Sequence, residues 1–194
     1  MQHAVAAGQD CGLVELYLAL DDRGPDDQRL ARLRRVKEHN PSDGNVRLNL
    51  GIILDKTGRV NDALAQVQDA IRIAPALGKA HFYLGLLLEE VGKPEQALTV
   101  YETAARLNED ITFVHYNLGI LLDRLGRIDD AIDQYRAELR LNPHFPEGRN
   151  NLGKALVVQN RLEEAVREFR AALKTRPDFA EAHNNLGRAL YLRA

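Results

Sequence analysis

One dipeptide, Leu-Gly, recurs along this chain of 194 residues at a constant interval of 34 residues. Five of its copies stand in this register, at Leu50-Gly51, Leu84-Gly85, Leu118-Gly119, Leu152-Gly153 and Leu186-Gly187. With Leu at about a tenth of residues and Gly at about 7%, four further pairs in register have a chance probability on the order of 10⁻⁹. A period of this length is typical of an array of stacked structural units, in which each unit covers the apolar face of its neighbour.

Other positions follow the same period. Alanine recurs at Ala63, Ala97, Ala131 and Ala165, and a large apolar residue follows each at Val67, Tyr101, Tyr135 and Phe169. Proline recurs at Pro75, Pro143 and Pro177, with Glu109 where a fourth would stand. The pattern resembles the tetratricopeptide repeat (TPR), which reads Trp-x₂-Leu-Gly-x₂-Tyr, then Ala-x₃-Phe, then Pro. Two positions depart from it: the Tyr position is always Leu, and the Trp position holds Arg47, His81, His115, Arg149 and His183.

The resemblance implies an all-α fold, a right-handed superhelical solenoid of antiparallel helix-turn-helix repeats. We expect repeats at 44–77, 78–111, 112–145 and 146–179, a degenerate N-terminal repeat or cap at 1–43, and at 180–194 the first helix of a further repeat or a terminal helix. The residues agree, because each unit has two amphipathic stretches of roughly 13 residues at helical spacing. Gly58, Gly92, Gly126 and Asn160 separate them, and these residue types readily enter the left-handed conformation after a helix. We predict nine or more helices and no strand.

The last predicted helix keeps the full motif, but no second helix follows it in the sequence. It ends with three candidates for an interface, Leu190, Tyr191 and Leu192. A terminal unit normally has a polar outer face. The sequence therefore predicts either self-association through these residues or a chain that is a fragment of a longer array.

In the TPR family the first helix of each repeat, helix A, lines a concave groove. Counting from Gly44 as place one, place six of helix A holds Asn49, Tyr83, Asn117, Asn151 and Asn185. An amide side chain both donates and accepts, so a row of amides suits the backbone of an extended peptide of any sequence. The row resembles the asparagine ladder in the TPR arm of O-linked N-acetylglucosamine transferases, although Tyr83 interrupts it. The alternative is that asparagine is simply a common surface residue of such helices.

The neighbouring groove positions change in character along the chain. Phe82 and Tyr116 belong to an apolar and aromatic part, whereas the later repeats carry Asn150, Lys154, Asn184 and Arg188. Apolar anchors at one end and cations at the other suit a segment with apolar side chains and an acidic group. The alternative for the aromatic residues is that they pack between neighbouring hairpins.

Several classes of function are disfavoured. A net charge of −2 offers no basic field for nucleic acid, and Ser42 and Cys11, the single serine and cysteine, lie in no catalytic motif. No phosphate-binding glycine loop occurs. The histidines at His81, His115 and His183 are 34 and 68 residues apart, on hairpins that set them too far apart to share one ion. We therefore expect no enzyme activity, no metal and no cofactor, and neither nucleic acid nor a membrane as partner.

The sequence shows no signal peptide and no stretch long and apolar enough to span a bilayer, so the cytoplasm is the default expectation. The main hypothesis is a protein–protein interaction scaffold that binds an extended peptide or protein segment in the groove. The alternative is the substrate-recognition arm of a larger enzyme, such as a glycosyltransferase, whose catalytic part is absent. A third interpretation, an RNA reader of the pentatricopeptide type, is weak because the repeats are one residue too short and the chain is not basic.

Overall fold

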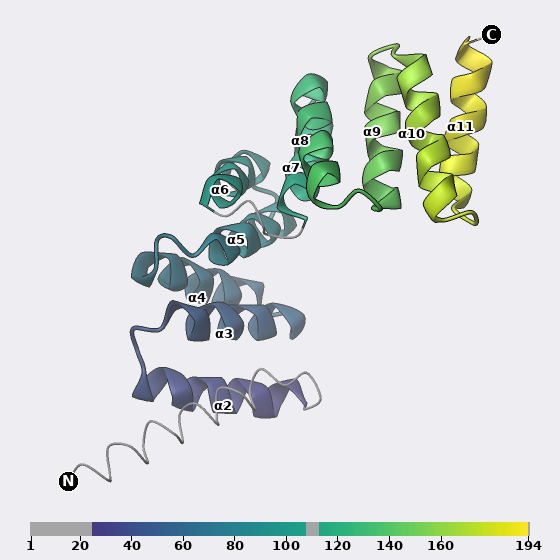
Figure 1. Ribbon diagram of the computed structural model, residues 1–194. Helices are drawn as coiled ribbons and strands as arrows, with labels where there is room; N and C mark the ends of the chain where they lie inside the picture. The colour runs from purple at the N-terminus through teal and green to yellow at the C-terminus, as the bar shows by residue number, and fades with distance from the viewer. Residues whose placement is uncertain (1–24, 108–112, 194) are drawn as a thin grey trace. The chain divides into compact units, whose positions relative to one another are not determined.

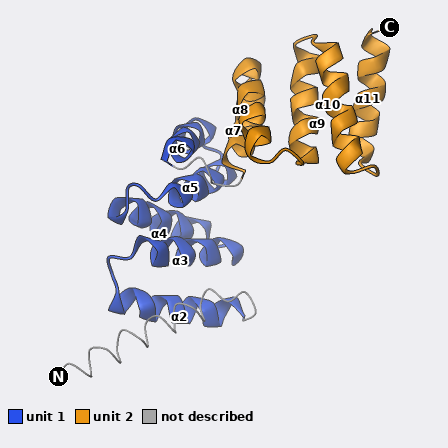
Figure 2. Cartoon of the chain, viewed as in Figure 1, with its two compact units in different colours: residues 1–107 blue, residues 108–194 orange. Residues whose placement is uncertain are grey.

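The computed structural model describes residues 25–107 and 113–193. They form two compact units, one ending at Leu107 and the other following it (Figure 2). Ten helices and no strand occur among the described residues, which confirms the predicted all-α repeat fold. Part of the predicted N-terminal repeat, residues 1–24, lies outside the described residues, as do Cys11 and Glu109.

Residues 25–107 of the first unit form five helices. They are α2 (Asp26–His39), α3 (Gly44–Lys56), α4 (Val60–Ile73), α5 (Gly78–Glu90) and α6 (Pro94–Leu107). Neighbours in the sequence pack against one another, and short turns make α3 and α4, and α5 and α6, into antiparallel hairpins (Figure 1). The start of α3 is capped by the carboxylate of Asp43, which accepts hydrogen bonds from the backbone N–H of Asn45 at 2.8 Å and of Val46 at 3.4 Å.

The second unit repeats this arrangement. Its helices are α7 (Val114–Arg124), α8 (Ile128–Leu141), α9 (Pro146–Val158), α10 (Leu162–Thr175) and α11 (Ala180–Arg193). Here α7 pairs with α8, α9 with α10, and α11 packs against α10 and α9 (Figure 1). The hairpin turns use the predicted left-handed residues: φ is 77° at Gly126 and 57° at Asn160.

Close contact between the two helices of a hairpin explains the periodic glycine. A Cβ added to Gly119 would lie 2.7 Å from the ring of Tyr135, and one added to Gly153 would lie 2.5 Å from the ring of Phe169. Both rings are buried, as are the alanines one turn earlier in the same helices. The glycine therefore provides the space in which the aromatic residue of the second helix sits.

Polar side chains replace the usual Trp and still join the two helices. Arg47 on α3 contacts Asp69 on α4 at 3.0 Å, and Arg149 on α9 contacts Glu168 on α10 at 2.7 Å. His115 on α7 lies 2.8 Å from the side-chain oxygen of Gln134 on α8. The departure from the family pattern thus exchanges an apolar contact for a polar one at the same place in the hairpin.

Candidate functional site

The predicted site residues of the first unit lie on α3 and α5. Asn49 is half-buried, and its side-chain amide donates to the backbone carbonyl of Asn45 in its own helix at 2.8 Å. Phe82 is also half-buried, with its ring 5.8 Å from the ring of the buried Tyr101. Part of the Phe82 ring therefore packs inside its hairpin, which is the alternative that the sequence left open for the aromatic residues.

Tyr83 interrupts the asparagine row for a structural reason. Its hydroxyl donates a hydrogen bond to the carboxylate of Asp55, which lies one hairpin earlier on α3. Burial and this carboxylate raise the pKa of Tyr83 well above its usual range. Burial and the negative charge of Asp55 also raise the pKa of Glu90, so two carboxylates lie close together beside the tyrosine. The sequence predicts an apolar surface here and does not reveal these acidic residues, which lie in the last turns of α3 and α5.

In the second unit the asparagine row divides into two kinds of residue. The amide of Asn117 donates to the backbone carbonyl of Phe113 in the preceding turn, at 2.9 Å. Asn151 instead reaches the neighbouring helix A, where its amide donates to the hydroxyl of Tyr116 at 3.2 Å. Asn185 reaches back from α11 to α9 and donates to the side-chain oxygen of Asn150 at 2.9 Å. Asn151 and Asn185 therefore link successive helices A, and the oxygens of their side-chain amides accept no hydrogen bond from the described residues.

Asn150 does not lie on the surface that the sequence predicted for it. The residue belongs to α9, is 1% exposed and is hydrogen-bonded to Asn185 on α11. A buried amide requires partners, and Asn185 supplies one of them. Asn150 accordingly positions Asn185 rather than presenting its own amide to solvent.

The two predicted cations have different surroundings. Lys154 on α9 forms an ion pair with Glu181 on α11 at 3.3 Å. Arg188 on α11 is exposed, and its side chain forms no hydrogen bond or ion pair with the residues that the structure describes. The same holds for the side chain of Asn184 one turn earlier. In a helix, residues at spacings of three and four share one face, so Asn184, Asn185 and Arg188 form a single polar surface on α11. Of the two predicted cations, Arg188 rather than Lys154 is thus the one without an acidic partner in the described ranges.

An aromatic cluster lies at the start of α7. The ring of Phe145 is 4.8 Å from that of Tyr116 and 5.1 Å from that of Phe113, measured between ring centroids. Phe113 has φ of 68°, a left-handed conformation that is uncommon for a bulky residue. Burial and the negative charge of Glu147 raise the pKa of Tyr116.

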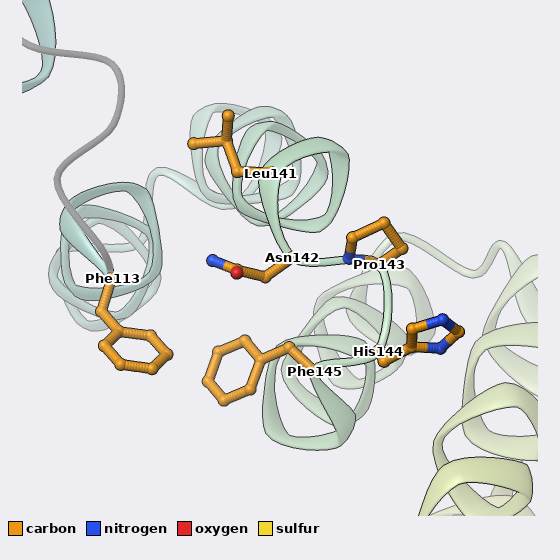
Figure 3. Close-up of a pocket in the computed structure, with 6 residues that line it drawn as sticks. All are labelled: Phe113, Leu141, Asn142, Pro143, His144 and Phe145. Carbon is orange, nitrogen blue, oxygen red and sulfur yellow. The ribbon is translucent and has the colours of Figure 1, made fainter.

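The cluster borders an open hollow of about 330 Å³. Figure 3 shows Phe113 and Phe145 side by side at its edge, with Asn142 and Pro143 from the loop between α8 and α9. The sequence does not single out Phe145, because only its proximity in space to Phe113 and Tyr116 distinguishes it. A hollow with aromatic walls suits an apolar side chain.

The periodic histidines have structural partners. His81 and His183 each lie within 2.9 Å of a backbone carbonyl of the preceding loop, that of Pro75 or Pro177. In the described ranges, no three His, Cys, Asp or Glu side chains are grouped so that they could hold a metal ion. No helix in those ranges has the length and apolar character needed to cross a membrane.

Comparison with known families places the chain in one of them. Residues 28–77 and 82–146 match the tetratricopeptide repeat, and residues 153–192 match a TPR repeat. The chain therefore belongs to the tetratricopeptide repeat family. No curated protein matches it.

Solved structures of TPR proteins share this fold. PilF of Pseudomonas aeruginosa is 18% identical with a TM-score of 0.85, over 96% of this chain and 86% of its own. YrrB, described as a TPR protein with an unusual peptide-binding site, is 21% identical with a TM-score of 0.74, over 94% of this chain and 95% of its own. MamA from AMB-1 is 29% identical with a TM-score of 0.71, over 87% of this chain and 96% of its own.

Proposed function

We propose that this chain is a protein–protein interaction scaffold, and that an extended segment of its partner binds to the helix A face of α9 and α11. The observation that carries the proposal is the polar surface of α11, where Asn184 and Arg188 are exposed and unpaired within the described part of the chain. Exposed polar groups that repeat in register along successive helices can bind a ligand that is itself extended.

Each group has a distinct role in this proposal. The side chains of Asn151 and Asn185 are fixed by hydrogen bonds from their Nδ2 atoms. Their Oδ1 atoms can therefore accept hydrogen bonds from backbone N–H groups of the ligand. Arg188 pairs with a carboxylate of the ligand, and its planar guanidinium favours a bidentate contact. Lys154 is a weaker candidate because Glu181 already neutralises it.

An apolar side chain of the ligand enters the hollow beside Phe113 and Phe145. The surface beside Tyr116 and Asn117 connects this hollow to α9, because the Tyr116 hydroxyl is bonded to Asn151. The ligand in this proposal therefore combines an apolar residue with an acidic one.

The first unit has a helix A face of its own, on which Asn49, Phe82 and Tyr83 stay candidate binding residues. Its character differs, since Asp55 and Glu90 lie beside Tyr83. This face favours a basic or apolar segment of a partner over an acidic one.

A binding role without catalysis fits both the family and the absence of a catalytic motif in the sequence. The family includes YrrB, whose description names a peptide-binding site. The alternative, a substrate-recognition arm of a glycosyltransferase, rests on the asparagine row alone. The hydrogen bonds of that row support this alternative less than they support the scaffold. The side-chain amides of Asn49 and Asn117 donate to backbone carbonyls of their own helices, so these nitrogens already have a partner.

An acidic peptide library tests the proposal. We expect the chain to select peptides that contain an apolar and an acidic residue. Arg188→Glu should reduce the affinity for these peptides by about tenfold or more, because the substitution replaces a charge-assisted contact by repulsion. The matched control is Arg170→Glu on α10, which makes the same change of charge at an exposed residue outside the helix A face.

A double variant, Asn151→Ala with Asn185→Ala, should weaken binding further without changing the preference for acidic peptides. Circular dichroism must show that each variant keeps its helicity. If the folded Arg188→Glu chain binds the same peptides as tightly as the unchanged chain and the Arg170→Glu control, the face of α9 and α11 is not the site.

A further inference from the structure

The hollow at the start of α7 gathers apolar side chains that the fold leaves partly uncovered. Phe113 is 41% exposed and Leu141 is 42% exposed, although both side chains are large and apolar. Both line the hollow, together with Pro143 and the ring of Phe145. All four residues belong to the second unit, so the hollow lies within a single compact unit. Exposed apolar side chains that gather at a concave surface mark a binding site.

The side chain of Asn142 brings an amide to this wall. Figure 3 shows it extending from the loop between α8 and α9 toward the space that Phe113 and Leu141 border. Its Nδ2 atom donates a hydrogen bond to the carboxylate of Glu138 on α8. A carboxylate accepts hydrogen bonds and does not donate them, so this contact determines which end of the amide faces Glu138.

Glu138 holds the amide in this orientation. The residue is 0% exposed, and its carboxylate also accepts a hydrogen bond from the backbone N–H of Tyr116 at 3.3 Å. A buried side chain with two partners has little freedom to turn. The Oδ1 atom of Asn142 accepts no hydrogen bond from the described residues. An acceptor of fixed orientation therefore lies beside the aromatic rings of the hollow.

This acceptor restricts what can occupy the hollow favourably. An aliphatic side chain would cover the Oδ1 atom of Asn142 and offer it no hydrogen bond, which costs free energy. An aromatic ring can pack edge-on or offset against the rings of Phe113 and Phe145. A ring that also carries an N–H or O–H group can donate to Oδ1 at the same time. Sites of this kind combine apolar walls with a few polar groups that provide specificity.

We propose that the hollow selects a tyrosine or a tryptophan of the bound segment, and that Asn142 determines this specificity by accepting a hydrogen bond from the ring's O–H or N–H group. Glu138 does not touch the ligand and acts as a positioning residue. This inference rests on the proposed function, because it names the side chain that enters the hollow. The partner segment then combines a donor-bearing aromatic residue with an acidic one.

Two bicyclic molecules test the specificity directly. Indole and benzofuran have nearly the same shape, but only indole carries an N–H donor. We would titrate the ¹⁵N-labelled full chain with each and follow the backbone amides of Phe113 and Phe145 and the side-chain amide of Asn142. Indole should bind about three to ten times more tightly than benzofuran, which is the effect of one net hydrogen bond. Neither molecule has a carboxylate for Arg188, so the result does not depend on the acidic contact.

Two variants assign the preference to the amide. Asn142→Leu keeps the size of the side chain and removes the acceptor, so it should abolish the preference for indole. Glu138→Gln introduces an amide that can donate to Oδ1 of Asn142, so it should also reduce the preference while benzofuran still binds. The matched control is Gln68→Leu, which replaces an exposed amide on α4 of the other unit and should leave the preference unchanged. Circular dichroism checks that each variant keeps its helicity.

The comparison on the unchanged chain requires no variant to fold. Equal affinities of indole and benzofuran would overturn the inference, and so would the failure of both to bind up to their solubility limits. A preference for indole that persists in a folded Asn142→Leu chain would show that another residue provides it.

Acidic peptides that differ only at their apolar position separate this inference from the proposed function. We expect tyrosine or tryptophan at that position to bind more tightly than phenylalanine or leucine. Peptides that bind to α9 and α11 equally well with all four residues would overturn the specificity of the hollow alone. Selective binding of indole by a chain that binds no acidic peptide would instead overturn the proposed function and leave the role of Asn142 in place.

Discussion

Single residues in this chain have effects that depend on their place in the repeat. Gly153 and Gly187 occupy the same place on α9 and α11, yet only the first faces a ring. The period in the sequence predicts the same role for both. Their surroundings differ because α10 covers Gly153, whereas the corresponding side of α11 is uncovered in the described structure.

The two glycines should respond in opposite ways to alanine. Gly153→Ala places a Cβ 2.5 Å from the buried Phe169 ring, and overpacking of this kind typically costs about 1–3 kcal/mol. Gly187→Ala meets no atom of the described residues and gains helix propensity of up to about 1 kcal/mol. Urea unfolding at low protein concentration measures both. Equal effects of the two substitutions would contradict the packing role of the periodic glycine.

The charge of Asp69 should make stability depend on pH. A hydrogen bond from Arg72 and the positive charge of Arg47 lower the pKa of this carboxyl. A lowered pKa in the folded state means that the stabilisation is present above the usual carboxyl pKa of about 4 and is lost as the pH falls through the lower folded value. Asp69→Asn should thus reduce stability at pH 7 by up to about 1 kcal/mol and have progressively less effect below about pH 4.

Thermal melting across this pH range provides the measurement. Asp178→Asn is the matched control, because this exposed carboxyl forms no hydrogen bond or ion pair with the described residues. A constant difference between Asp69→Asn and the unchanged chain at all pH values would show that the charge is not responsible.

At the scale of the element, α7 begins in an unusual way. Its N-cap residue, Phe113, has no side chain that can accept a hydrogen bond, and the carboxylate of Glu138 on α8 performs this role instead. Glu138 is fully buried and accepts from the backbone N–H of Tyr116 at 3.3 Å and from the side-chain amide of Asn142. A carboxylate at this end of the helix is also favoured by the helix dipole.

Replacement of Glu138 tests this cap. The same place holds alanine in the other three repeats, at Ala70, Ala104 and Ala172. The repeat pattern alone therefore predicts that Glu138→Ala is harmless. We expect a loss of about 1–3 kcal/mol instead, because two partly buried donors lose their acceptor. Hydrogen exchange at the Tyr116 amide should accelerate more than exchange within α10. A variant as stable as the unchanged chain would show that Glu138 is not a cap.

The sequence predicts the elements better than it predicts the site. The period determines where helices begin and where Gly126 and Asn160 turn the chain, because these depend on backbone preference and on packing that repeats. It does not reveal that Asn150 is buried or that Glu181 pairs with Lys154. Such contacts join neighbouring repeats, and they depend on which rotamer each side chain adopts. Phe145 was missed for the same reason.

At the scale of the whole molecule, the two units present helix A faces of different chemistry. The first has carboxylates beside Tyr83, and the second has amides and Arg188, which is unpaired in the described ranges. A repeat protein can combine such differences without a change of fold, because each repeat packs only on its neighbours. Function in this chain is therefore assigned to side chains on a shared scaffold, not to the scaffold itself.

The central claim is that a partner segment binds to the helix A face of α9 and α11. The most direct measurement is an NMR titration of the ¹⁵N-labelled chain with an acidic peptide selected from the library. We predict that the largest shift changes fall on Asn151, Asn185 and Arg188, with little change on α10. Changes that concentrate on α8 and α10, or a peptide that binds without any change on α9 and α11, would contradict the account.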